Sequence, residues 1–559
     1  MRSLPPDEVV IQLTPKAGNY TRPRVPTHTS WTAPSLSMSD QASSERHIPP
    51  NRRRLASKQS GSTRRFVAGP SFFNYESFGS LRPGQDWVRL FHPRYVGLAV
   101  HVTVCGFAFY FFSYGYGRLI AEYLKANDDR QVKAANYVLI WPLVMYLVLV
   151  TMDAYSDSGD LLYATASRTT ATGSALNKTK DASPYAWAYI AVSLLAAIGI
   201  QIAWVSAVAA SVEFAQREHI HNRGRLQATL LMLYYFGAFV AQLLAACVIN
   251  EGATEDSRFV AMLSIGRSAT ILAAVALVAF PFVLLCFHED PFVNTPRVGM
   301  PLKDRLQSFW KFCHHNVVYR VLFFAVLHLF FIGQFNQNAR DAVQKWSHVT
   351  RDGALSIDAA RPMANLLTVL VWKLLLRNVS WRALCFYGSV LYIMTYTLLT
   401  LFTTYNIVRN EWFFAAMIMI TEIPRGWLLL FTFVLATEIA DVGHEGVTVG
   451  LTISYQALAG LTDFTLASLY PGLMGYKVTT KQVEEDSPRT RSNVMTAYAI
   501  ITVVNVLCLT VIRLVPQQKL DAQQLRAFGG YNKYASTALA LTFGVLLCFN
   551  LACNLMVAL

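Results

Sequence analysis

Glu422, Arg425 and Asp463 are ionisable residues inside long apolar stretches, where such side chains are rare. Glu422 and Arg425 are three residues apart, which places both on one face of a helix. An unpaired carboxylate costs about 2.5–3.5 kcal/mol at the centre of a membrane helix, so Asp463 indicates a partner, a hydrated cavity or a bound proton. With the amides Gln456 and Asn505, these three are the candidate solute-binding residues. The alternative for Asp463 is a tolerated, hydrogen-bonded helix residue.

The chain carries none of the arrangements that catalysis or metal binding usually requires. We find no GxSxG, HExxH, P-loop or paired CxxC motif, and the glycines are scattered through the chain. Seven of the eight cysteines lie within apolar stretches and Cys313 lies in a connection, a pattern without disulfide or metal spacing. The sequence therefore predicts neither an enzyme nor a cofactor nor a bound metal.

Twelve apolar stretches, each long enough to cross a bilayer, position these residues. They run roughly over 95–117, 134–152, 185–209, 228–249, 262–287, 317–335, 357–376, 381–402, 412–436, 446–470, 494–514 and 533–557. Charged residues make up 15% of the chain, well below the ~25% of soluble domains. A soluble fold cannot bury so many helices that are apolar all round. The sequence predicts an all-α polytopic membrane protein with about 12 transmembrane helices.

These stretches divide the chain into five predicted parts. Residues 1–80 form a basic tail without stable structure, 81–287 a bundle of five spans, 288–316 a central connection with an amphipathic helix, 317–514 a second bundle, and 515–559 a linker with an extra C-terminal span. The stretch 317–335 ends in a polar run that includes Gln334 and Asn336. We interpret this run as a helix end that enters water, with a solute contact as the alternative.

The net charge of +14 is concentrated in the first 94 residues, which are rich in Ser, Pro and Arg. Such a composition favours a solvated tail that contacts anionic lipid headgroups of the bilayer. Nucleic acid is not an expected partner.

Several loop motifs resemble the folate–biopterin transporter family, a branch related to the major facilitator transporters. The motifs are VEFAQRE at 212–218, RGRLQ at 223–227, NVSWR at 378–382, EIADVGHEG at 438–446 and LVPQQK at 514–519. The similarity runs from about residue 80 to 535 and is nearest to the members found in water moulds. It implies two helical bundles and secondary transport of a folate- or pterin-like organic anion, with or without coupled protons.

In facilitator-type folds the two bundles rock about a central site, and cytoplasmic loop charges hold one face closed. The first loop here carries the mixed-charge cluster Glu213, Arg217, Glu218, Arg223 and Arg225, together with the motif residue Gly224. The second-half loop carries Glu438, Asp441, Glu445 and Gly446, with no lysine or arginine beside them. We therefore expect the two loops to form a cytoplasmic latch. The alternative is that both are only charges at the membrane boundary.

The sequence departs from the family in its first half. The usual second helix and its basic loop are missing, because the chain runs from Lys125 through 126–137 straight into the next span. Trp204 and Val208 replace acids of the family, and Tyr234 replaces an arginine. These losses favour a second hypothesis, a degenerate paralogue that no longer transports and acts as a structural or interaction protein.

The missing helix also affects the expected topology. Three spans before a cytoplasmic 213–227 loop place the basic tail outside, which the positive-inside rule disfavours. An external tail, a re-entrant early segment and a lost exon are the alternatives. Among three sequons, Asn177 lies in the loop best suited to glycosylation.

Overall fold

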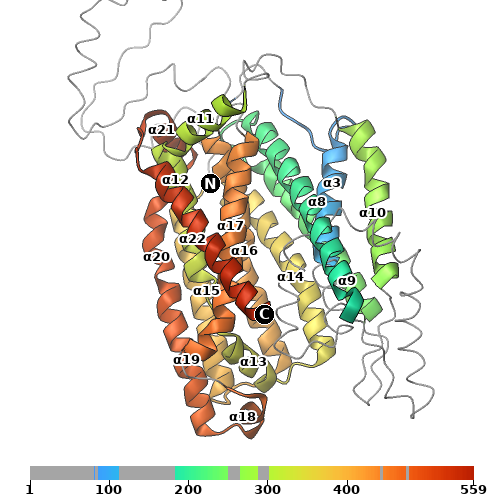
Figure 1. The fold of residues 1–559 in the computed structure, drawn as a ribbon, viewed down its shortest axis with the longest axis vertical. Helices are drawn as coiled ribbons and strands as arrows, with labels where there is room; N and C mark the ends of the chain where they lie inside the picture. The colour runs from blue at the N-terminus through green and yellow to red at the C-terminus, as the bar shows by residue number, and fades with distance from the viewer. Residues whose placement is uncertain are drawn as a thin grey trace, which may run out of the picture. The chain divides into compact units, whose positions relative to one another are not determined.

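The computed structural model of the protein describes residues 81, 86–111, 183–249, 265–287, 301–440, 445–473 and 478–558. Every regular element in these ranges is a helix (Figure 1). Eleven of the twelve apolar stretches coincide with helices. The stretch 134–152, the sequon Asn177 and the basic tail 1–80 lie outside the described residues. The all-helical fold predicted from hydropathy is confirmed.

Four helices belong to the described part of the first half. They are α3 (Val96–Tyr110), α8 (Ser183–Gln216), α9 (Arg225–Ile249) and α10 (Ile265–Cys286). α9 packs along α3, which in turn packs against α10. The α3–α9 contact is close because the two helices meet at glycines: a β-carbon on Gly106 would lie 2.0 Å from the Tyr234 carbonyl oxygen.

α3 begins at the end of the bundle where α8 ends. The backbone N–H of Leu81 donates to the carbonyl of Gln216 over 3.0 Å, and the ring centroids of Tyr95 and Phe214 are 5.3 Å apart. The chain therefore enters the first half beside the α8–α9 connection. The expectation that three spans place this entry opposite the connection is wrong, because α3 and α8 run in opposite directions.

The second half contains a larger set of helices. They are α12 (Asn316–Ile332), α13 (Gln337–Trp346), α14 (Arg351–Val371) with the π turn η4 (Trp372–Leu376), α15 (Trp381–Thr404), α16 (Glu411–Ile439), α17 (Glu445–Leu473), α18 (Thr480–Glu485), and α19 (Pro488–Val506) with α20 (Cys508–Val511) and η5 (Ile512–Leu514). The amphipathic α11 (Leu302–Cys313) precedes them, and α21 (Lys519–Phe528) and the apolar α22 (Ala535–Ala558) follow.

In the described ranges, eight helices are each long and apolar enough to cross a membrane. Taken together as one span, α12 and α13 are also long and apolar enough to cross a membrane, with a bend of 50° at the break between them. α17 is 29 residues long but more polar, because it carries Asp463 and several threonines. Thr452, Thr462 and Thr465 each donate to the carbonyl four residues earlier, so their hydroxyl groups are satisfied within the helix. These helices make the protein an integral, multi-pass membrane protein.

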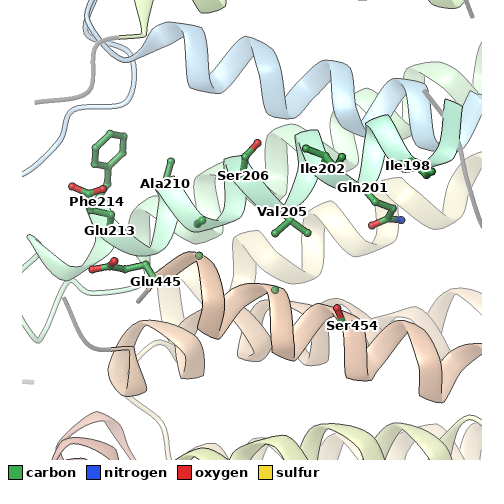
Figure 2. A pocket seen from close by; sticks show the side chains of 13 residues that line it. Ile198, Gln201, Ile202, Val205, Ser206, Ala210, Glu213, Phe214, Glu445 and Ser454 are labelled. Atoms are coloured by element: carbon green, nitrogen blue, oxygen red, sulfur yellow. The ribbon is translucent and has the colours of Figure 1, made fainter. Parts of the chain in front are cut away.

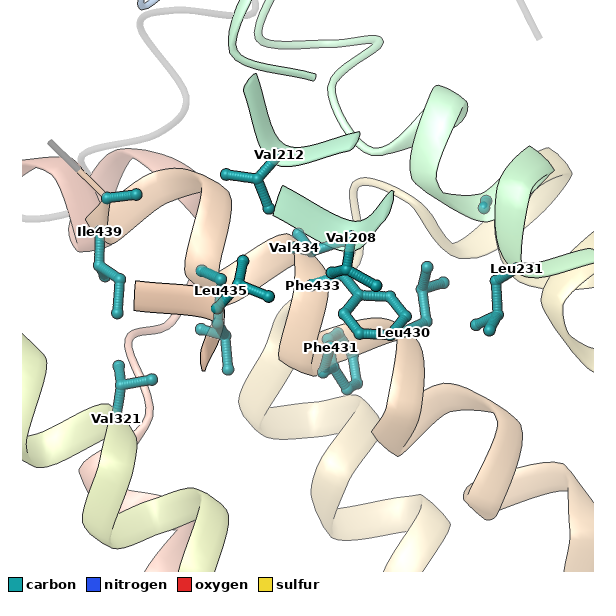
Figure 3. Close-up of a cluster of buried hydrophobic side chains, with 14 of the residues drawn as sticks. Val208, Val212, Leu231, Val321, Leu430, Phe431, Phe433, Val434, Leu435 and Ile439 are labelled. Carbon is teal, nitrogen blue, oxygen red and sulfur yellow. The ribbon is translucent and has the colours of Figure 1, made fainter. Parts of the chain in front are cut away.

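One hydrophobic core joins the two halves, and α16 lies at its centre (Figure 3). Leu430 and Val434 of α16 are fully buried, as is Val212 of α8. Further contacts between the halves run along α9 and α14, and along α8 and α17. The bundles are therefore closely packed where α8, α9, α16 and α17 meet.

The Lys and Arg residues of the described ranges gather at one end of the bundles. We call this the junction end: α8 and α16 end there, α9 and α17 begin there, and α21 lies beside them. Sixteen lie at or near it: Arg89, Arg94, Arg217, Arg223, Arg225, Lys303, Arg305, Lys311, Arg320, Lys373, Arg377, Arg382, Arg513, Lys519, Arg526 and Lys533. Eight lie at the opposite end: Arg267, Arg340, Lys345, Arg351, Arg409, Lys481, Arg489 and Arg491. The positive-inside rule assigns the junction end to the cytoplasmic side.

This orientation predicts a glycan on Asn177. α8 is 34 residues, or about 51 Å, long, which exceeds the ~30 Å of a bilayer core, and it begins at Ser183 on the external side. Asn177 precedes Ser183 by six residues and is therefore expected to be clear of the bilayer. The full chain made in a eukaryotic cell should lose a glycosidase-sensitive mass shift in Asn177→Gln. A glycan on Asn378, at the junction end, would contradict the orientation.

Candidate functional site

A buried ion pair connects the two halves at the junction end. The Arg223 guanidinium Nη1 lies 3.1 and 2.9 Å from the two carboxylate oxygens of Glu438. Both side chains have 0% exposure. Gln523 of α21 donates a further hydrogen bond of 2.7 Å to Glu438. Because the pair is out of water and Glu438 has a second donor, this contact joins the first loop firmly to α16.

The chain geometry before α9 places Arg223 in this position. The Glu218 carboxylate accepts the backbone N–H groups of Gly224 (2.9 Å) and Leu226 (3.1 Å), which caps the start of α9. Gly224 has a φ of +96°, a conformation that favours glycine. A β-carbon at this position would lie 3.0 Å from the Trp372 ring, so the loop also packs tightly against the end of α14.

Side chains of the first half and of α21 also satisfy the carbonyl groups at the end of α16. Gln216 donates to the carbonyls of Thr437 (3.3 Å) and Ala440 (3.0 Å), and Gln227 donates to the Thr437 hydroxyl over 2.6 Å. Arg526 donates to the Ala440 carbonyl over 3.0 Å. The last carbonyls of a helix have no partner within the helix. Separation of the two halves would therefore break several hydrogen bonds besides the ion pair.

Two further titratable groups at the junction are buried. Burial raises the pKa of Glu218 to about 7, against the opposing effects of the Leu226 and Gly224 amides and of the cations Arg223 and Lys519. Burial lowers the pKa of Lys519 to about 8, with Glu438 opposing the shift. The Lys519 ammonium donates to the carbonyl of Ile220 over 3.0 Å.

The other predicted loop residues occupy different positions. Glu213 forms an ion pair with Arg217 on its own helix over 3.1 Å, not across the two halves. Glu445 and Gly446 begin α17 and line a groove against α8. Asp441 lies outside the described residues.

This groove lies between α8 and α17 and has a volume of about 680 Å³ (Figure 2). Its α17 wall contains small residues, Gly446, Gly450 and Ser454, and Gln201 is a polar group on the α8 wall. A β-carbon on Gly450 would meet no atom within 4 Å, so this wall of the groove is open.

A second cluster of charges lies inside the membrane-spanning part of the second half. The Glu422 carboxylate accepts hydrogen bonds from Arg425 (3.1 Å) and from the amide of Asn365 on α14 (2.9 Å). Arg361 of α14 lies 3.7 Å from Glu422 and 3.4 Å from Asp358. The predicted local pair of Glu422 and Arg425 is therefore part of a network between α14 and α16.

This cluster faces the first half and has an accessible cation. Tyr235 of α9 is within electrostatic range of Glu422 and Arg425. Glu422 is 5% exposed, whereas the Arg425 side chain is 54% exposed, although it lies fourteen residues, or about 21 Å, from the end of α16. Arg361, Arg425 and Arg340 also lie within electrostatic range of the Tyr396 hydroxyl. Arginines from α13, α14 and α16 thus converge on one region.

Asp463 lies at the break between α12 and α13 and is 4% exposed. Gln334 donates to its carboxylate over 2.5 Å and accepts the hydroxyl proton of Tyr470. Gln334 is 2% exposed, so the interpretation of this polar run as a helix end in water is wrong for Gln334. The Arg425 guanidinium acts on Asp463 only through space.

The two predicted amides make contacts between helices. Gln456 of α17 donates to the Thr432 hydroxyl of α16. The Asn505 amide, oriented as a donor, lies 3.1 Å from the Phe331 carbonyl of α12. Neither contact brings these amides into the cluster around Glu422.

In the first half, an aromatic pair stands where the resemblance implies charges. The ring centroids of Trp204 and Tyr234 are 4.4 Å apart, and Trp204 also contacts Phe433 of α16 at 5.7 Å. Trp204 and Tyr234 therefore face each other and fill the space between α8, α9 and α16. Val208 is buried in the hydrophobic core.

Sequence reasoning missed Arg361 and Asn365, the α14 partners of Glu422. The available signal was an arginine inside the apolar stretch 357–376, followed four residues later by an amide on the same helix face. No group of His, Cys, Asp or Glu in the described residues is arranged to hold a metal ion.

Comparison with solved structures assigns the fold. The major facilitator superfamily proton:xylose symporter XylE bound to 6-bromo-6-deoxy-D-glucose matches with a TM-score of 0.50 and 13% identity, covering 77% of this chain and 98% of that chain. XylE from E. coli in a partially occluded inward open conformation matches with a TM-score of 0.47 and 13% identity, covering 76% and 98%. No family model and no curated protein matches the sequence. The fold is that of the major facilitator transporters.

The junction pair predicts a strong asymmetry between single and double variants. Arg223→Met leaves the Glu438 carboxylate buried without its cation and should lower the free energy of unfolding by about 3–5 kcal/mol. Arg223→Met combined with Glu438→Met should recover most of this loss, measured by thermal unfolding in detergent. As a control, Arg489→Gln removes an exposed cation at the opposite end and should cost under about 1 kcal/mol. A double variant as unstable as Arg223→Met would contradict the prediction.

Glu218 predicts a pH dependence of stability. Its native pKa of about 7 lies above the ordinary value of 4.5, so the folded chain keeps the proton between these values while the unfolded chain has lost it. The contribution of Glu218 to the free energy of unfolding is therefore largest below pH 4.5 and is lost as the pH rises to about 7. Glu218→Gln should flatten this slope in thermal unfolding between pH 4.5 and 8. An unchanged slope would show that Glu218 does not titrate there.

Proposed function

We propose that the protein is a secondary transporter that moves a small organic anion between its two helical bundles. The observation that carries this proposal is the charged network of Glu422, Arg425 and Arg361 within the membrane-spanning helices, one of which, α14, packs against α9 of the other half. Solute sites of such transporters lie near the bilayer midplane between the two repeats. Ionisable groups at that depth mark solute or ion pathways.

Arg425 is the proposed contact for the anionic group of the solute. Its side chain is 54% exposed, and a guanidinium can bind a carboxylate through two parallel hydrogen bonds. Glu422 holds the guanidinium in place and is itself held by the Asn365 amide, so Glu422 acts as a positioning residue. Folate and pterins carry a planar heteroaromatic ring, and the half-buried Trp204 offers an aromatic face near the first half. The folate or pterin class rests on the resemblance of the loop motifs.

The junction contacts are proposed as the cytoplasmic latch. The Arg223–Glu438 pair and the side-chain caps on α16 hold α8 and α9 against the second half at this end. Access from the cytoplasm would require these contacts to separate together. The structure therefore corresponds to a state of the proposed cycle in which the cytoplasmic face is closed.

Asp463 is the proposed proton carrier. It is buried, it accepts a hydrogen bond from the neutral Gln334 amide, and Arg425 acts on it electrostatically. These contacts give the ionised form of the carboxylate little stabilisation. Because Asp463 lies at the α12–α13 break, a change in its protonation acts at the point where these helices bend.

One observation favours the alternative of a paralogue that no longer transports and acts as a structural or interaction protein. Trp204, Tyr234 and Phe433 pack together between the halves, at positions where the resemblance implies an acid and an arginine. Such packing fills the space that polar groups would hydrate.

The transport proposal is tested by uptake of labelled folate or biopterin in cells that lack their own transporter. Arg425→Gln should lower uptake by about tenfold or more, because a hydrogen bond to a charged group contributes about 1.5–3 kcal/mol. Asp463→Asn should abolish the pH dependence of uptake without loss of expression. Arg513→Gln removes an exposed cation of the junction end and should leave uptake unchanged. If the wild-type chain moves no such anion, the alternative is favoured.

A further inference from the structure

Three cations from both halves meet at the junction end beside the Arg223–Glu438 pair. Arg225 begins α9, Lys373 lies in η4 and Arg377 follows η4. The contact between Gly224 and the Trp372 ring brings these elements together. Electrostatic coupling of Lys373 with both Arg225 and Arg377 places the three charges close to one another.

These cations lack anionic partners in the part of the chain that the structure describes. None of the three side chains forms a hydrogen bond or ion pair there, and the buried Nε of Arg377 has no acceptor. Glu218 is the acid that acts on both Lys373 and Arg377, but its oxygens accept the amides of α9. Burial lowers the pKa of Arg377, Glu218 opposes this shift, and Arg225 adds to it. The group therefore has excess positive charge.

Exposed apolar side chains adjoin the three cations. Leu374 and Leu375 are 67% and 75% exposed, and Val371 is 43% exposed. These residues belong to the last turns of a membrane-spanning helix, so their exposed surface faces acyl chains. Cations directly beside lipid-facing leucines at the cytoplasmic boundary match an amphiphile with an anionic head and apolar tails.

We infer that Arg225, Lys373 and Arg377 bind the phosphate headgroup of an anionic phospholipid of the cytoplasmic leaflet, with its acyl chains against Leu374 and Leu375. The phosphate oxygens accept hydrogen bonds from the guanidinium and ammonium groups and supply the missing acceptor at Arg377. Arg225 belongs to the first half, whereas Lys373 and Arg377 belong to the second. A lipid at this site therefore bridges the halves and, on the basis of the proposed function, stabilises the state with a closed cytoplasmic face.

Binding is measured on the full chain purified in detergent, by native mass spectrometry of phosphatidylserine adducts with phosphatidylcholine as the reference. The test variant carries Arg225→Gln, Lys373→Gln and Arg377→Gln. Each cation is expected to contribute about fivefold, equivalent to about 1 kcal/mol, so the variant should bind phosphatidylserine about a hundredfold more weakly. The control variant carries Lys303→Gln, Lys311→Gln and Lys533→Gln, which removes three exposed charges from the same end, and should change binding less than about twofold.

A folding defect is separated from a binding defect by thermal unfolding in phosphatidylcholine alone. There the test variant should be at least as stable as the wild type, because three mutually repelling charges are gone. Equal losses of phosphatidylserine binding in both variants would overturn the site in favour of bulk surface charge. Inorganic phosphate that binds with the same dependence on the three cations, without lipid binding, would assign the site to a soluble anion. Neither result depends on whether the protein transports.

Discussion

The buried contact between Arg223 and Glu438 sets the register of the two halves. Moving two charges out of water costs several kcal/mol per ion, which is recovered only if the geometry is good and other donors complete the site. Here the Arg223 Nη1 contacts both carboxylate oxygens, and Gln523 adds a second donor to Glu438. With α9 fixed against α16 at this point, Tyr235 lies about three turns along α9, within electrostatic range of Glu422 and Arg425.

The two charged clusters of the protein differ in how far their side chains are exposed to solvent. The Arg223 and Glu438 side chains have no exposed surface. In the membrane-spanning network the acid is buried but Arg425 is largely exposed. A sealed pair can hold two bodies together, whereas an exposed guanidinium can exchange partners. The proposed transporter needs both features: a sealed pair that closes one face, and an exposed guanidinium that binds the solute.

The helices were predictable from the sequence because the bilayer imposes length and apolarity on each span separately. The loop motifs also indicated which segments approach the junction.

The specific partners were not predictable. Arg223 selects Glu438 and not Glu445 because Glu218 and Gly224 fix the turn before α9, and that turn depends on the Trp372 ring of the other half. Gln334 was placed in water because a polar run after an apolar stretch normally marks a helix end. Its contact with Asp463 exists only because α17 packs against α12.

The junction also constrains how the chain is made. Arg223 precedes Glu438 by 215 residues, and Lys519 reaches back over 299 residues to the carbonyl of Ile220. During translation the first loop is synthesised well before Glu438 and Lys519. Arg223 is therefore exposed to water until Glu438 has been made. Glu438 lies in the last turn of α16, so it can pair with Arg223 only after this helix has been made. The contacts of the first loop are thus completed only after α21 has been made, and a chain that stops before α21 lacks Lys519 and Gln523.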